Sequence, residues 1–78
     1  MVKITIGNRY IGAPIEEYNT SLPDLSDPEQ NDVLVADAIN YYLEEHKDAR
    51  RMNCPDVDYD TLVEGCFYML EEVPDESI

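Results

Sequence analysis

Apolar and polar side chains alternate at the start of the chain. Residues 2–6 read Val-Lys-Ile-Thr-Ile, the period of two that is typical of a half-buried strand. A Gly7-Asn8 pair separates this run from a second β-prone run at residues 9–13, and a glycine followed by asparagine suits a type II′ turn. The pattern therefore predicts a β-hairpin over about residues 2–13, ended by Pro14. Its turn would pair Ile4 with Ile11, Val2 with Ala13 and Thr5 with Tyr10.

A helical spacing of apolar residues follows a proline-containing loop at residues 14–25. Ser26, followed three residues later by Glu29, has the form of a capping box at a helix start. The apolar positions beyond it fall on one stripe of a helix: Val35, Ile39, Tyr42 and His46. We expect this helix to cover about residues 27–52, where an Asn-Cys-Pro sequence ends it.

A second helix is predicted over about residues 57–73. Its apolar positions have the three-four spacing of one helix face: Tyr59, Leu62, Val63, Cys66, Leu70 and Val73. Gly65 costs a helix interior about 1 kcal/mol relative to alanine, so we interpret it as a close approach of two backbones. Pro74 ends the helix.

These elements predict a small α+β domain in the order ββαα, with two amphipathic helices covering one face of a hairpin. Of the 78 residues, 44% are hydrophobic, which is normal for a globular protein and unlike a disordered acidic chain. We assign residues 1–74 to this single domain and residues 75–78 to a frayed acidic tail. The N-terminus is unlike a signal peptide and no apolar run could span a membrane, so we expect a cytoplasmic protein with reduced cysteines.

Charge is the most unusual property of the chain. Eighteen aspartate and glutamate residues stand against five lysine and arginine residues, which gives a formal net charge of −13. This imbalance repels nucleic acid and anionic membranes and attracts basic proteins, so no direct binding to DNA, RNA or a membrane is expected. Repulsion among the carboxylates also opposes folding, and added salt should weaken it.

An acidic triplet precedes the second predicted helix. Asp56, Asp58 and Asp60 have the D-x-D-x-D opening of a calcium-binding loop, but Thr61 and Phe67 stand where that loop has its glycine and its last glutamate. Carboxylates at a helix start are favoured by the helix dipole without a cation. We therefore interpret the triplet as helix capping, with a weak divalent-cation site as the alternative.

Metal and nucleophile chemistry have little support elsewhere. His46, Cys54 and Cys66 lack the closely spaced cysteine pair of structural zinc sites. We expect His46 to pack on the buried stripe and Cys66 to be a small core residue. Acidic neighbours raise the pKa of a thiol and so disfavour nucleophilic catalysis. Three separate glycines form no phosphate-binding loop, and the sequence predicts neither an enzyme nor a cofactor.

Two tyrosines, Tyr41 and Tyr68, lie outside the predicted apolar stripes and are surrounded by carboxylates. Such an aromatic side chain suits an interface anchor, because it offers buried area while the acids meet lysine or arginine of a partner. The alternative is a solvated face. The candidate partner-binding residues are Asp37, Tyr41, Glu44, Glu45 and Asp48 on the first helix, and Asp60, Glu64, Tyr68, Glu71 and Glu72 on the second.

Rows of carboxylates, small size and missing catalytic residues together resemble the acidic inhibitors that phages and mobile elements encode. That class includes DNA mimics with anti-restriction or anti-CRISPR activity and inhibitors of uracil-DNA glycosylase. The resemblance implies that the carboxylates take the place of phosphates in the basic groove of a nucleic-acid-binding protein, in the host-cell cytoplasm if the chain is phage-encoded.

Two other functions are compatible with the sequence. The first is a non-catalytic adaptor or regulatory subunit that binds one protein through exposed tyrosines or the hairpin edge, with a homodimer of paired hairpins as one arrangement. The second is a divalent-cation binder. A mimic should depend on its carboxylates and on salt, whereas an adaptor should depend on Tyr10 or Tyr68.

Overall fold

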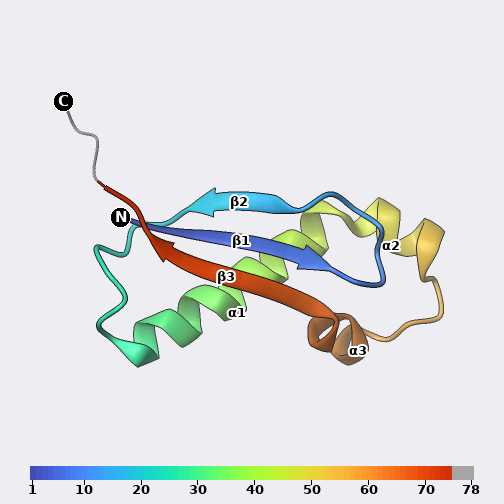
Figure 1. Ribbon diagram of the computed structural model, residues 1–78. Helices are drawn as coiled ribbons and strands as arrows, with labels where there is room; N and C mark the ends of the chain where they lie inside the picture. Colours follow the sequence, from blue (N-terminus) through green and yellow to red (C-terminus); the bar gives the residue numbers. More distant parts are fainter. Residues whose placement is uncertain (75–78) are drawn as a thin grey trace.

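A three-stranded antiparallel sheet in the order β2-β1-β3 forms the centre of the protein, and α1 crosses one of its faces (Figure 1). The structure is a computed structural model that describes residues 1–74. Its elements are β1 (Val2–Asn8), β2 (Glu16–Asn19), α1 (Pro28–Glu45), α2 (Lys47–Asn53), α3 (Tyr59–Glu64) and β3 (Cys66–Glu72). The predicted α+β class is confirmed, but the ββαα order is wrong, because the described chain has three strands and three helices. The tail predicted at residues 75–78 lies outside the described residues.

The alternation at the N-terminus produces the central strand of the sheet. Val2, Ile4 and Ile6 are fully buried, and they point to the face on which α1 packs. Lys3 and Thr5 point to the other face, which no helix or strand of the described chain covers (Figure 1). The central strand therefore has one face in the core and one face toward solvent, even though it lies between two other strands.

The predicted hairpin turn at Gly7-Asn8 is wrong, because β1 continues through both residues. Its partner is β2, and the register places Ile4 opposite Tyr18. The predicted pairs Ile4–Ile11, Val2–Ala13 and Thr5–Tyr10 therefore do not form. The physical reason lies in Asn8, whose side-chain oxygen accepts hydrogen bonds from the backbone N–H of Tyr10 at 2.8 Å and of Ile11 at 3.3 Å. These bonds turn the chain after the strand. Ile11, in the loop that follows, is fully buried in the core.

The first predicted helix begins one residue late and is interrupted. Asp27, not Ser26, is the N-cap, and its carboxylate accepts a hydrogen bond from the Glu29 N–H at 3.0 Å. His46 leaves the helical conformation with ψ of 28° and separates α1 from α2. The guanidinium of Arg50 in α2 donates to the Leu43 carbonyl at 3.1 Å, which ties the two helices together.

The second predicted helix, about residues 57–73, is the largest error. Only α3 is helical, and the chain then passes through Gly65 into β3, which pairs along the whole of β1. Cys66 and Leu70 fit a period of two as well as a helical one, and the free edge of β1 offers a full hydrogen-bond ladder. Gly65 marks a close approach, but of a side chain and not of a second backbone as predicted, since a Cβ atom there would lie 2.5 Å from the Tyr10 ring.

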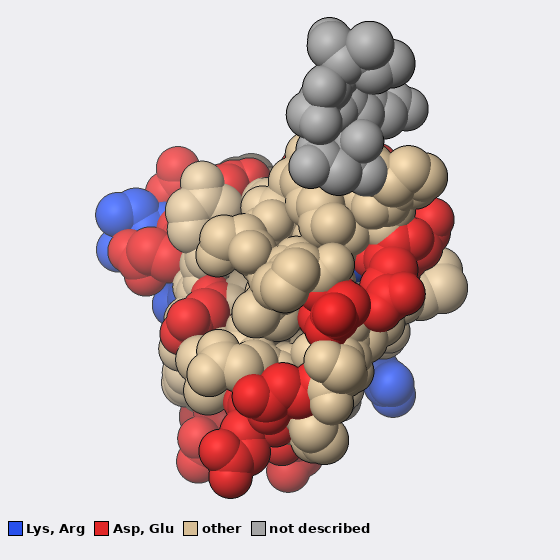
Figure 2. All heavy atoms as spheres, turned by 90° about the vertical axis from the view of Figure 1, so that its left-hand side faces the viewer, with Lys and Arg blue, Asp and Glu red and all other residues tan. Residues whose placement is uncertain are grey.

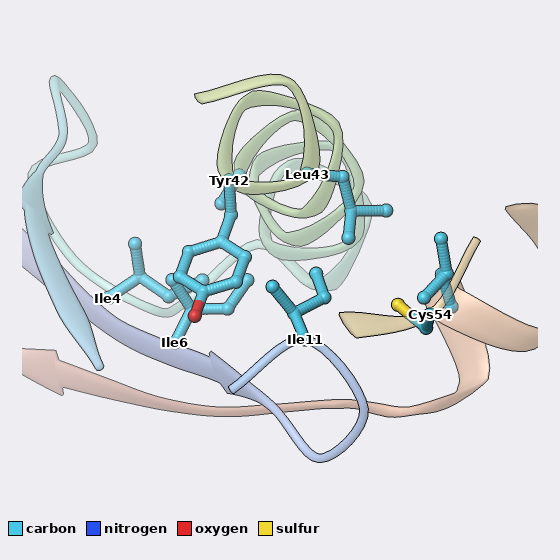
Figure 3. Close-up of a cluster of buried hydrophobic side chains, with 8 residues drawn as sticks. Ile4, Ile6, Ile11, Tyr42, Leu43 and Cys54 are labelled. Carbon is cyan, nitrogen blue, oxygen red and sulfur yellow. The ribbon is translucent and has the colours of Figure 1, made fainter. Parts of the chain in front are cut away.

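The core lies between the covered face of the sheet and α1. Tyr42 and Leu43 point from α1 toward Ile6 and Ile11, and Cys54 closes the cluster from the end of α2 (Figure 3). The Tyr42 hydroxyl donates to the Pro14 carbonyl at 2.9 Å, so its polar end is satisfied inside the protein. Within residues 1–74, no helix has both the length and the apolar character needed to cross a membrane.

Candidate functional site

Acidic side chains are spread over several elements of the surface. Figure 2 shows aspartate and glutamate side chains over the end of the molecule where β1 and α1 begin, with lysine and arginine near the margins of that view. Most of the acids in the described chain are exposed. The charge therefore faces solvent, where a partner could meet it.

The outer side of α1 brings together three of the predicted partner-binding residues. Asp37, Tyr41 and Glu44 are spaced four and three residues apart, so they share one helix face, and all three are exposed. Glu44 lies 3.9 Å from the ammonium of Lys47, an exposed pair worth little in stability. Asp37 forms no ion pair with the described residues, so its charge is available to a partner.

A groove of about 350 Å³ lies between α1 and β2, next to this helix face. Its base is apolar, and its rim carries a carboxylate and two tyrosine rings. The lining residues that matter are Ile4, Leu34 and Ala38 at the base and Asp37, Tyr18 and Tyr41 at the rim. An apolar groove with one acidic group suits a long basic side chain.

Tyr18 and Tyr41 form the aromatic wall of the groove. Their rings meet edge to face, with centroids 5.1 Å apart. Burial, then the charges of Glu45 and Glu16, raises the pKa of Tyr18 to about 12. A hydrogen bond to Glu45 raises the pKa of Tyr41. Both phenols therefore remain neutral donors at physiological pH.

The second predicted acidic group is divided between two elements. Asp60 and Glu64 lie on α3, whereas Tyr68, Glu71 and Glu72 lie on β3. Glu71 shares the uncovered sheet face with Lys3, whose ammonium is 3.9 Å away, and Glu72 points to the opposite face and accepts a hydrogen bond from the Leu25 N–H at 2.8 Å. The continuous row of acids expected on one helix does not exist.

The edge strand β3 exposes apolar side chains that the helix prediction obscured. Tyr68 is 51% exposed and Met69 is 62% exposed. Because β3 pairs only with β1 in the described sheet, its outer edge has backbone groups free to pair. This strand is a second surface at which a protein partner could dock.

Glu16, Glu45 and His46 converge where β2 begins and α1 ends. His46 Nε2 lies 3.5 Å from a Glu16 oxygen and 3.7 Å from a Glu45 oxygen. The predicted packing of His46 is confirmed, since its ring lies 4.6 Å from the ring of Tyr42. Sequence reasoning missed Glu16, which it placed in a loop; nothing local links that residue to a histidine thirty positions later.

The other residues considered as metal ligands in the sequence do not come together in the structure. Neither the Asp56, Asp58 and Asp60 triplet nor the His46, Cys54 and Cys66 set forms a three-ligand group in the part of the chain that the structure describes. Asp58 is the N-cap of α3 and accepts a hydrogen bond from the Thr61 N–H at 2.8 Å. Hydrogen bonds from Thr61 lower the pKa of Asp58, which confirms the capping interpretation for this residue.

The cysteines and Asp48 complete the predicted residues. Cys54 is a free, buried core thiol. Cys66 accepts a hydrogen bond from the side-chain amide of Asn8 at 3.2 Å, and burial raises its pKa. Asp48 is exposed in the first turn of α2, beyond the end of α1.

Comparison of the chain with protein-family models, curated proteins and solved structures finds no match in any of the three.

Proposed function

We propose that this protein is an acidic inhibitor that binds a basic, nucleic-acid-binding surface of another protein and thereby excludes nucleic acid. The observation that carries the proposal is the outer side of α1, where Asp37 and Glu44 flank an exposed Tyr41 beside an apolar groove. Carboxylates there would meet lysine and arginine residues that otherwise bind phosphates.

The groove supplies an anchor that charge alone lacks. The aliphatic stem of an arginine or lysine from the partner would lie on Leu34, with its charged end at Asp37. A guanidinium could also stack on the Tyr41 ring. Steering by a net charge of −13 would speed encounter, and the groove would fix the position of one basic residue.

The test begins with capture of the partner from a lysate of the source organism at low and moderate salt. The captured protein is purified, and its binding to a labelled nucleic acid is measured by fluorescence anisotropy with increasing amounts of the acidic protein. Competitive displacement that weakens with salt is expected. A captured partner that keeps its nucleic acid at saturating inhibitor would contradict the proposal.

Charge reversal locates the surface. The pair Asp37→Lys and Glu44→Lys should weaken inhibition at least tenfold, about 1.4 kcal/mol or more. Glu17→Lys with Asp56→Lys changes the net charge equally at two exposed positions outside α1 and is the matched control. Equal losses in both double variants would mean that net charge, and not the α1 surface, determines binding.

The β3 edge favours a second candidate function, an adaptor that binds one protein by strand addition or forms a homodimer. Antiparallel self-pairing would place the acidic end of β3 opposite the apolar start of its copy, which avoids contact between like charges. Light scattering at increasing concentration would detect the dimer. Tyr68→Lys should abolish it, whereas Met52→Lys, at an exposed position in α2, should not.

A further inference from the structure

Glu16, Glu45 and His46 are arranged like ligands of a metal ion. Their three donor atoms all lie within 4.8 Å of one another. They come from the first residue of β2, the last residue of α1 and the residue that caps α1. The group therefore joins the start of β2 to the end of α1.

The spacing is longer than that of a direct hydrogen bond. Charge-assisted hydrogen bonds between nitrogen and carboxylate oxygen are about 2.7–2.9 Å long, whereas His46 Nε2 is 3.5 Å and 3.7 Å from the two carboxylates. Atoms bound to one tetrahedral ion at about 2.0–2.2 Å lie about 3.3–3.6 Å apart. The two separations from His46 Nε2 are close to the edges of such a tetrahedron, and the two carboxylate oxygens lie within 4.8 Å of each other.

A second observation concerns the histidine itself. His46 Nε2 is buried and has no hydrogen-bond partner in the described structure, and the His46 side chain is only 15% exposed. A buried polar atom without a partner is costly, and here it is directed at two carboxylates. The buried hydroxyl of Tyr18 also lacks a partner.

The surroundings hold the imidazole in place. The His46 ring packs against Tyr42 at a tilt of 54°, and the Tyr42 hydroxyl is bound to the carbonyl of Pro14, two residues before Glu16. Metal sites depend on such supporting contacts to orient their ligands. The Tyr42–Pro14 bond also holds the chain just before β2 against α1.

We infer that Glu16, Glu45 and His46 form a binding site for a divalent transition-metal ion of the zinc class. One imidazole and two carboxylates suit such an ion and leave a fourth position for water. The ion would neutralise two carboxylates in a strongly acidic protein and would link β2 to the end of α1. This site adjoins the outer side of α1, because Glu45 is hydrogen-bonded to Tyr41, but the inference does not rest on the proposed inhibitory function.

The direct test is titration of the full chain with Zn²⁺ by calorimetry at neutral pH. One saturable site per chain is expected. His46→Gln and Glu16→Gln should each weaken Zn²⁺ binding by tenfold or more, whereas Asp56→Asn with Asp60→Asn, which removes two exposed carboxylates elsewhere, should leave it unchanged. Equal affinity in wild type and His46→Gln would overturn the inference.

A measurement on the wild-type protein guards against variants that fail to fold. The chain has a single histidine, so nitrogen-15 NMR reports on His46 Nε2 without ambiguity. Saturating Zn²⁺ should shift that resonance, and Co²⁺ should give an absorption spectrum without thiolate charge-transfer bands. An unmoved resonance, or bands from Cys54 or Cys66, would show that this group is not the site.

Discussion

The ring of Phe67 on β3 lies over Gly7 on β1, directly opposite it in the ladder. A Cβ atom at Gly7 would come within 2.6 Å of the ring's Cζ atom and 3.1 Å of Ile15. Gly7 does not have a positive φ, so the glycine is needed for space and not for its backbone freedom. The contact fixes Phe67 on the uncovered sheet face.

Gly7→Ala should therefore destabilise the protein by about 1–3 kcal/mol through overpacking. Urea denaturation followed by circular dichroism would measure the change. In a Phe67→Ala background the same substitution should cost much less, since the ring that it meets is gone. A double-mutant cycle without coupling would show that the contact does not constrain the strand pair.

Asn8 should be one of the most sensitive polar residues. Its side-chain amide donates to the Leu62 carbonyl at 2.7 Å, and its oxygen accepts from the N–H of Tyr10. Asn8→Ala leaves these buried groups without partners and should cost about 2–3 kcal/mol in unfolding free energy. Asn19→Ala, at an exposed position on β2, is the control and should stay within about 0.5 kcal/mol of wild type.

The first strand can be predicted from sequence because its alternation is local and its covered face is fully buried. The helical stripe of α1 is equally clear. The class α+β follows from these two elements alone. What lies around them depends on contacts between residues far apart in the chain.

The segment at residues 66–72 shows why. Cys66 and Leu70 fit both a helical and a strand period, and no local residue decides between them. The decision comes from β1, whose edge accepts a strand more than fifty residues away. Strand β2 is likewise determined by its pairing with β1, because its sequence Glu-Glu-Tyr-Asn has only one β-prone side chain, that of Tyr18. This error also affects the candidate site. Glu71 and Glu72 are predicted to share a helix face, but on β3 they point to opposite faces of the sheet.

Stability should increase with ionic strength. The formal net charge is −13, and the lysine ion pairs within residues 1–74 are weak because their carboxylates are largely exposed. Raising NaCl from about 50 mM to about 500 mM shortens the screening length, and each kcal/mol of repulsion removed should raise Tm by about 4–8 °C. Near pH 4, where many carboxylates are protonated, the effect should shrink. A Tm that falls with salt at neutral pH contradicts this prediction.

Alkaline pH should destabilise the protein through Tyr18. Burial, Glu45 and Glu16 raise the pKa of this phenol from 10.0 to about 12. Between these values the unfolded chain has released the proton and the folded chain has kept it, so stability falls as pH rises. The contribution of the neutral Tyr18 phenol to the free energy of unfolding is complete below pH 10 and is lost as the pH rises to about 12. The phenylalanine of a Tyr18→Phe variant cannot ionise, so the unfolding free energy of the variant should decline less steeply over this range.

Ultraviolet titration of the folded wild type should show a late-ionising tyrosine that the variant lacks. Identical titration curves for the two proteins would refute the assignment to Tyr18.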